Sequence, residues 1–346
     1  LGTYDTPGFA RGLFMDGNYA YIADGENGLV VLNISNPSAI EQAAYYDSPG
    51  NARGIDRFDY GDGAKTYLAD GSEGLQVLAV NVSTGDVGWL ASWKPEDYPV
   101  NVEAVIVLDR MVYMALGDQG VRVIRVSLEN TVFDNYAITD TPGYAQDLMM
   151  YGTYLYVADG VGGLRVINKD TELLNELGAF NSAGIASGLD LYCPVSGCYV
   201  FLADTSSVYV ATALTVTYPT GMASRSSLAL PTRLAVSGTT AYLADPLQGL
   251  RIVNLSNPSQ PTLTGTFDTP GVMYDVAVRE AMAYVADGLA GLQMVDITDP
   301  SLPVKRGEVN TPGESVGAAL ADDAVYLADS DNGLVGITFT ETLTGT

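Results

Sequence analysis

The stretch Tyr21-Ile-Ala-Asp24-Gly25, followed by Gly28-Leu-Val-Val-Leu32, decides the fold, because it recurs along the whole chain. Its pattern is an aromatic residue, two small or apolar residues, an Asp, a short turn that contains Gly, and an apolar run. The anchor position of the pattern falls at residues 24, 70, 116, 159, 204, 245, 287 and 329. A period of about 43 residues divides all 346 residues into eight units, so we expect one domain over residues 1–346 with no linker.

Each unit contains four short apolar runs, which we interpret as strands. In the first unit we expect strands at residues 10–15, 19–23, 29–34 and 42–46, with Gly, Pro or Asn between them. No run has the length and period of an amphipathic helix. Short strands at this period are typical of a β-propeller with one four-stranded sheet per repeat. The sequence therefore predicts an all-β fold, a single β-propeller of eight four-stranded blades.

A propeller must join its first and last blades, and the chain ends indicate how. Residues 1–4 read Leu-Gly-Thr-Tyr and match Leu177-Gly-Ala-Phe180, which stands where an outer strand is expected. We therefore expect residues 1–4 to complete the last blade. The C-terminal residues 342–346 resemble residues 262–266, which lead into another outer strand, so both ends could compete for one place. The alternative is that a chain end completes a blade in a neighbouring copy and builds a fibre.

The composition excludes several classes of function. The 41 acidic residues against 16 basic ones give a net charge of −25, which argues against binding nucleic acid or an anionic membrane surface. The absence of His excludes catalytic triads, general bases and metal sites that depend on it. No apolar stretch is long enough to span a membrane.

Two features favour an extracellular location. The chain begins at Leu1 rather than Met, which we take as the mark of a removed leader segment. Cys193 and Cys198 stand close together across Pro194 and Gly197, so we expect a tight reversal closed by a structural disulfide. A lone pair of Cys cannot complete a zinc site, and its spacing is not that of redox proteins.

The run Gly249-Leu-Arg-Ile-Val-Asn-Leu-Ser-Asn-Pro-Ser-Gln-Pro261 recurs as Gly291-Leu-Gln-Met-Val-Asp-Ile-Thr-Asp-Pro-Ser-Leu-Pro303. Together with the Tyr-Val-Ala-Asp-Gly segment before the second run, it resembles the LVIVD repeat. The resemblance is specific in units one, two, four, six, seven and eight. It implies a β-propeller on a bacterial or archaeal surface or in a secreted protein, and it supplies no catalytic residues. Units three and five depart from it, since Leu116 replaces the Asp and Thr205-Ser-Ser-Val208 replaces the Gly-containing turn.

The repeated Asp is a candidate metal ligand. Blade geometry would gather these carboxylates on one face, where they could bind Ca²⁺, which prefers six to eight oxygen ligands. The alternative, which we favour, is that each Asp caps its own turn by accepting backbone N–H bonds. The residues concerned are Asp24, Asp70, Asp159, Asp204, Asp245, Asp287 and Asp329.

The innermost strands carry varied polar residues at two aligned positions that should border the axial channel near its mouth. Variation within a ring is what a ligand site needs, so these residues form a candidate site for a small anion or sugar, against the alternative of a solvated channel lining. The candidates are Arg11, Arg53, Glu103, Asp147, Arg233 and Asp275.

We expect a non-enzymatic binding or structural module of the cell surface or extracellular space, without a cofactor unless Ca²⁺ binds. Its partners would be other surface proteins or glycans. One alternative is a subunit of an extracellular fibre joined by strand exchange. The other is a hydrolase that acts on glycans through a pair of carboxylates.

Overall fold

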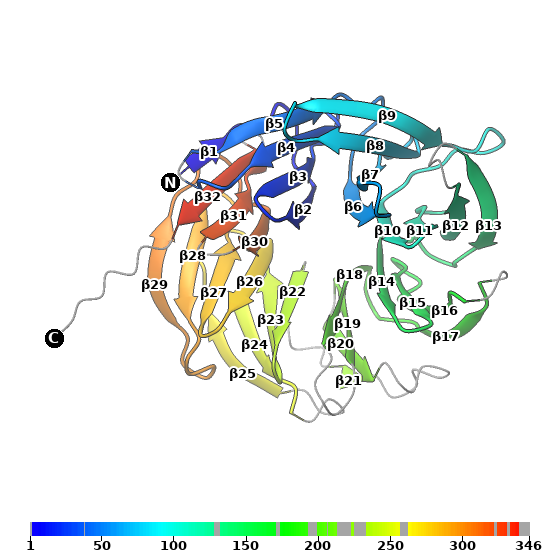
Figure 1. Cartoon of the computed structure of the whole chain (residues 1–346). Coiled ribbons are helices and arrows are strands. Elements are labelled where there is room, and N and C mark those ends of the chain that lie inside the picture. The colour runs from blue at the N-terminus through cyan, green and yellow to red at the C-terminus, as the bar shows by residue number, and fades with distance from the viewer. Residues whose placement is uncertain are drawn as a thin grey trace.

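The computed structural model describes residues 2–37, 39–127, 132–170, 174–192, 199–205, 207–212, 223–224, 233–256, 262–321, 324–330 and 333–338. These residues form a ring of small antiparallel sheets around a central axis (Figure 1). We number the sheets 1 to 8 in chain order, so that each corresponds to one repeat unit. Within each sheet the strands follow chain order from the axis outward, except at the closing sheet.

The strand bounds follow the repeat. Sheet 1 comprises β2 (Gly12–Asp16), β3 (Tyr19–Ala23), β4 (Leu29–Asn33) and β5 (Glu41–Tyr46), and sheet 2 comprises β6 (Gly54–Asp59), β7 (Ala64–Ala69), β8 (Leu75–Asn81) and β9 (Asp86–Trp93). Sheet 3 comprises β10 (Ala104–Leu108), β11 (Met111–Ala115), β12 (Val121–Val126) and β13 (Phe133–Thr139), and sheet 4 comprises β14 (Asp147–Tyr151), β15 (Tyr154–Ala158), β16 (Leu164–Asn168) and β17 (Glu176–Phe180). Sheet 5 comprises β18 (Ala186–Tyr192), β19 (Tyr199–Asp204), β20 (Ser207–Thr212) and β21 (Ala223–Ser224), and sheet 6 comprises β22 (Arg233–Ser237), β23 (Thr240–Asp245), β24 (Gly249–Asn254) and β25 (Thr262–Phe267). Sheet 7 comprises β26 (Asp275–Arg279), β27 (Met282–Ala286), β28 (Leu292–Asp296) and β29 (Val304–Val309). Sheet 8, the closing sheet, comprises β30 (Gly317–Ala321), β31 (Ala324–Ala328), β32 (Leu334–Thr338) and the N-terminal strand β1 (Gly2–Tyr4).

Apolar side chains fill the spaces between neighbouring sheets. The aromatic residue that opens the repeat pattern lies in the second strand and packs against the following sheet. Tyr21 of sheet 1, for example, contacts a cluster that includes Leu68 and Leu78 of sheet 2. The same arrangement joins sheet 8 to sheet 1, where Tyr326 packs with Ile22. No sheet can bury both of its faces alone, so burial between neighbours holds the ring together.

The expectation of eight four-stranded blades needs correction at sheet 5. Seven sheets are complete blades, but the outer strand of sheet 5, β21, has only two residues. The Gly that closes the turn between the second and third strands in every other sheet, such as Gly28 with a φ of 74°, is replaced here by Val208. Asp204 instead pairs directly with Ser207 in a tight hairpin. Within the described part of sheet 5, Phe201 alone joins the buried cluster shared with sheet 6. The ring therefore consists of seven regular blades and one irregular sheet.

The N-terminal strand lies in the closing sheet. β1 pairs antiparallel with β32, with Gly2 opposite Gly336 and Tyr4 opposite Leu334. Leu1, part of the segment expected to close the ring, lies outside the described residues. The Tyr326 hydroxyl donates a hydrogen bond of 3.1 Å to the carbonyl oxygen of Ile34 across the seam between sheets 8 and 1.

Candidate functional site

A cavity of about 410 Å³ opens at one end of the axial channel, where the innermost strands begin. All six candidate ligand residues from the sequence line this cavity: Arg11, Arg53, Glu103, Asp147, Arg233 and Asp275. Gln146 and Ser187 line it as well. The structure thus brings together residues that lie up to 264 positions apart in the sequence.

The repeat explains why these side chains meet. The amide nitrogens of Arg11, Arg53 and Glu103 donate to the carbonyl oxygens of Ala23, Ala69 and Ala115, which end the second strands of their sheets. Equal backbone bonding places these three residues at equivalent heights around the axis. The alignment of the repeats therefore predicts the ring of lining residues, although their mutual contacts depend on side-chain length.

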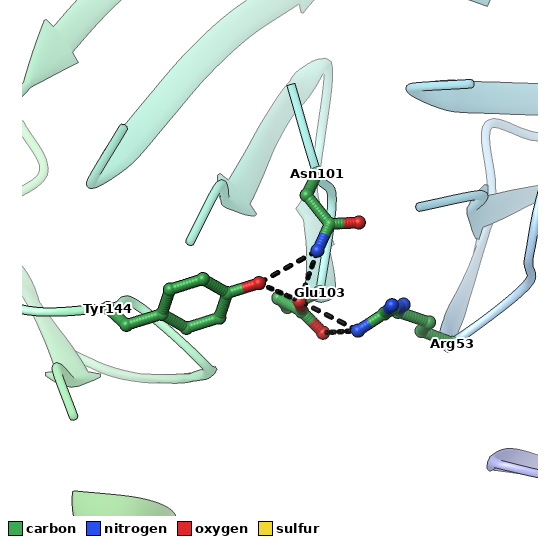
Figure 2. Close-up of polar contacts among 4 residues, drawn as sticks. All are labelled: Arg53, Asn101, Glu103 and Tyr144. Carbon is green, nitrogen blue, oxygen red and sulfur yellow. Dashed lines mark hydrogen bonds and ion pairs between the residues drawn. The ribbon is translucent and has the colours of Figure 1, made fainter. Parts of the chain in front are cut away.

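Four side chains form a polar cluster (Figure 2), and two of them, Arg53 and Glu103, line the cavity. Arg53 Nη1 lies 2.8 Å and 2.6 Å from the two carboxylate oxygens of Glu103. Asn101 Nδ2 lies 2.6 Å from Glu103 Oε1 and 2.7 Å from the Tyr144 hydroxyl, which also donates to Glu103. Burial and the bond to Glu103 raise the pKa of Tyr144. The charge of Glu103 is thus compensated within the cluster, so Arg53 is held in place.

Asp147 and Asp275 tie neighbouring sheets together. Asp147 Oδ1 accepts a hydrogen bond from the amide of Leu148 in its own strand, and Oδ2 accepts one of 3.1 Å from the amide of Leu189 in sheet 5. Asp275 bridges sheets 7 and 8 in the same way, with Oδ2 3.0 Å from the amide of Ala318. Burial raises the pKa of both carboxyls, and the positive charge of Arg233 opposes that rise. Since both oxygens of each carboxyl accept main-chain N–H bonds, these two groups join the sheets.

Arg11 and Arg233 differ from Arg53. Both are exposed at the cavity, and neither has an ion-pair partner among the residues that the structure describes. The Arg11 guanidinium carbon lies 5.2 Å from the ring centre of Phe9, so it is in range of a cation–π interaction. Both guanidinium groups can donate hydrogen bonds to an anionic group in the cavity, and the charge of Arg233 also acts on the carboxyls of Asp147 and Asp275.

The repeated Asp residues are fully buried, and six of them hold the connector that leads into their own sheet. Asp24 Oδ1 accepts from the Thr6 hydroxyl at 2.7 Å, and Oδ2 accepts from the Gly8 amide, also at 2.7 Å. The corresponding donors are Ser48 and Gly50 at Asp70, Thr141 and Gly143 at Asp159, Gly184 at Asp204, Gly271 at Asp287, and Gly313 and Ser315 at Asp329. We call each such contact a connector clip. Burial raises the pKa of Asp24, Asp159 and Asp287, and raises that of Asp70 to about 6.

The interpretation that each Asp caps its own turn is therefore wrong, except at Asp245. Asp245 Oδ1 accepts from the amides of Leu247 and Gln248 in its own turn. The sequence contains a signal that would have indicated the clip. Unit three, which has Leu116 in place of the Asp, also has Tyr98-Pro99-Val100 where the connectors of units one, two, four, seven and eight have Thr-Pro-Gly or Ser-Pro-Gly. The Asp and the connector are thus replaced together, because each satisfies the other.

The calcium hypothesis gains no support from this arrangement. Among the described residues, no group of three or more acidic, His or Cys side chains could hold a metal ion. Buried carboxylates whose oxygens already accept hydrogen bonds are poor ligands for an added cation. The expected disulfide between Cys193 and Cys198 lies outside the described residues. Within the described ranges, no helix has the length and apolar character needed to cross a membrane.

The ring of sheets, with a cavity at its axis, defines the class as a β-propeller. Within that class, the chain carries LVIVD repeats, which confirms the resemblance drawn from its sequence. Four segments match the LVIVD repeat, at residues 7–48, 142–168, 232–269 and 270–311. They correspond to units one, four, six and seven. No curated protein matches the chain by sequence.

Solved structures with similar folds include natural and designed proteins. Sqt1 of Saccharomyces cerevisiae superposes with a TM-score of 0.79 at 8% identity, covering 99% of this chain and 99% of that chain. The computationally designed Ika8 protein gives 0.74 at 10% identity, covering 98% of this chain and 100% of that chain. Sqt1 of Chaetomium thermophilum, bound to the N-terminus of the ribosomal protein L10, gives a TM-score of 0.75 at 11% identity, covering 98% of this chain and 99% of that chain. Identities this low show a shared fold alone.

Proposed function

We propose that the protein is a non-enzymatic binding module of a cell surface or the extracellular space, and that its axial cavity binds a small acidic ligand such as an acidic sugar. The coarser statement, a binding or structural module, fits the β-propeller fold and its LVIVD repeats. One observation carries the finer statement. Arg11 and Arg233 line the cavity without an ion-pair partner among the described residues.

The size and chemistry of the cavity suit this kind of ligand. A volume of about 410 Å³ lies within the range of small-molecule sites. A carboxylate offers guanidinium groups the acceptor geometry that they match best. The Arg53 and Glu103 side chains, held in place by Asn101 and Tyr144, provide a fixed polar wall against which sugar hydroxyls can bind. The extracellular location rests on the sequence, through the acidic composition and the implied family setting.

Binding of glucuronate tests this proposal, with glucose as the neutral control ligand of similar shape. Isothermal titration should show glucuronate binding and no glucose binding. Arg11→Gln and Arg233→Gln should each lower the affinity for glucuronate at least tenfold. Arg306→Gln is the matched control, because Arg306 lies on outer strand β29 and pairs with Asp296 away from the cavity. Equal binding of glucose, or unchanged affinity in both cavity variants, would refute the proposal.

A glycan hydrolase remains the second candidate because two carboxyls with raised pKa, Asp147 and Asp275, line the same cavity. A raised pKa is what a general acid needs. Against this role, all four of their oxygens accept main-chain N–H bonds, which favours a sheet-joining role. Release of reducing sugar from a glycan panel, lost in Asp147→Asn or Asp275→Asn, would favour the hydrolase over the binding module.

The fibre alternative requires an open outer place in the closing sheet. That place is taken by the chain's own strand β1, which pairs with β32 over three residues. The contact therefore gives strand exchange no support.

A further inference from the structure

The turn tips that carry exposed aliphatic side chains lie on one half of the face that carries the cavity mouth. At the turn between the second and third strands, the residue two positions after the anchor is Val161, Leu247 or Leu289 in sheets 4, 6 and 7. Their exposed fractions are 70%, 74% and 81%. At the same position in the other five units the sequence has polar residues: Glu26, Ser72, Asp118, Ser206 and Asp331.

The fold does not require this difference. The turn that carries Glu26 and the turn that carries Leu289 close with the same backbone bond, Asp24 N to Gly28 O and Asp287 N to Gly291 O, each 2.8 Å long. Both tips are exposed, so neither side chain supports the core. A large apolar side chain at such a tip only exposes surface to water, unless a partner covers it.

Two further apolar residues extend this surface. Ile185 and Val272 follow the connectors into sheets 5 and 7 and are exposed as well. Ala186, next to Ile185, pairs with Gly160, next to Val161. The backbone of Val272 lies against Gly288, next to Leu289. We call the set Val161, Ile185, Leu247, Val272 and Leu289 the apolar arc.

The exposed charged side chains in the turns and connectors that carry the apolar arc are negative, and Arg165 and Arg251, which lie behind two of these turns, are buried. Asp140 and Asp268, both exposed, open the connectors into sheets 4 and 7. The backbone of Asp268 packs on Gly249, at the end of the turn that holds Leu247. Glu314, in the connector into sheet 8, accepts a hydrogen bond from the Tyr274 hydroxyl. These turns and connectors, residues 140–144, 159–163, 181–185, 204–208, 245–249, 268–272, 287–291 and 310–314, contain no Lys or Arg.

We propose that the apolar arc is a docking surface for a basic, amphipathic protein segment, which buries its apolar side chains on Leu247 and Leu289 and directs Lys or Arg toward Asp140 and Asp268. Burial of large aliphatic side chains supplies the affinity. The carboxylates select the charge of the partner and speed its approach. This surface is separate from the cavity, and the proposal does not depend on a cavity ligand.

A second copy of this chain does not fit the same surface. Each copy carries a net charge of −25, and a two-fold contact would bring Asp140 and Asp268 of both copies close together. Like charges at close range oppose such a contact. A partner with the opposite charge relieves the repulsion instead.

The test uses two synthetic peptides that differ only in charge, LKKLLKLLKKLLKL and its counterpart with Glu at every Lys. Fluorescence anisotropy should show binding of the Lys peptide to the full chain and none of the Glu peptide. Raising the salt concentration should weaken the binding of the Lys peptide. The double variant Leu247→Ser/Leu289→Ser should lower its affinity at least tenfold. Asp140→Lys/Asp268→Lys should also lower it, with a smaller salt dependence.

Leu302→Ser is the matched control, because Leu302 is also 70% exposed but lies in the loop before β29, between the third and fourth strands of sheet 7. It should change the affinity by less than twofold. Unchanged folding of every variant is checked by its denaturation midpoint. Equal binding of the Glu peptide, or equal loss in Leu302→Ser, would overturn the proposal. Sedimentation that shows a dimer in the parent chain and a monomer in the Leu247→Ser/Leu289→Ser variant would also overturn it, since the occupant would then be a second copy.

Discussion

Replacing Thr6 by Val is the sharpest test of the connector clip. The change keeps the side-chain shape and removes the hydroxyl that donates a hydrogen bond of 2.7 Å to Asp24 Oδ1. Both residues are almost completely buried, so water cannot replace the lost donor. A buried hydrogen bond to a charged group contributes about 1.5–3 kcal/mol, and we expect the free energy of unfolding to fall by that amount at pH 8. Urea denaturation followed by tyrosine and tryptophan fluorescence measures it.

The pH dependence of the loss identifies its cause. The hydroxyl stabilises the charged carboxylate, and burial already raises the pKa of Asp24 above its ordinary value of 3.8. As the pH falls toward 4, the folded protein protonates Asp24, and the difference between parent and Thr6→Val should shrink.

A double-mutant cycle with Asp24→Asn separates the contact from other effects of the change. The coupling between the two positions should exceed 1 kcal/mol at pH 8 (a charge-assisted bond) and decline at low pH. Thr266→Val, on the exposed side of outer strand β25, is the control and should stay within about 0.5 kcal/mol of the parent. A loss below that value in Thr6→Val, or zero coupling with Asp24, would refute the clip.

Three further predictions use the same measurement of unfolding free energy. Burial raises the pKa of Asp70 from 3.8 to about 6, so the folded state binds more protons than the unfolded state between these pH values. The contribution of Asp70 to the free energy of unfolding should therefore rise by up to about 3 kcal/mol as the pH falls from 7 to 4. Asp70→Asn should flatten this dependence of the unfolding free energy on pH, and an unchanged dependence would contradict the assignment. Asp147→Ala removes the bridge to Leu189 and should destabilise the chain by about 1–3 kcal/mol, whereas a neutral effect would show that the bridge contributes nothing. Gly143→Ala would place a Cβ 1.8 Å from the carbonyl oxygen of Asp159 and should lower the free energy of unfolding by about 1–3 kcal/mol. Gly88→Ala is the control, because the nearest atom to its new Cβ is 3.9 Å away, and it should lower the free energy of unfolding by less than about 1 kcal/mol. Equal losses in the two variants would count against the close approach of connector and anchor.

The repeat made much of the fold predictable. Strand β3, for example, spans Tyr19–Ala23, the range expected from the sequence, and β5 begins one residue earlier than expected. Because the period fixes the register, counting back 13 residues from the anchor also places Arg11 and Glu103 in the cavity. Periodicity transfers position from one unit to the next, which is why the cavity lining could be predicted from the sequence.

Contacts between side chains were less predictable, because the period places residues but does not pair them. The bond between Asp24 and Thr6 joins positions 18 residues apart, and the sequence was interpreted instead as a local turn cap. At sheet 5 the period itself fails, since Val208 stands where the other seven turns have a Gly with positive φ. The apolar arc was missed for a related reason. It consists of departures from the repeat at exposed turn tips, where the fold accepts polar and apolar side chains equally.

The pairing of β1 with β32 bears on how the chain acquires its structure during synthesis. Gly2 and Gly336 form one of the most distant contacts that a chain of this length can make, and bringing such remote segments together carries a large entropic cost. Until residues 334–338 have left the ribosome, the N-terminal strand has nothing to pair with, however early its neighbours in sheet 1 become ordered. Completion of the circle is therefore a late event, and a nascent chain arrested before β32 would leave both β1 and the sheet 1 side of the seam uncovered.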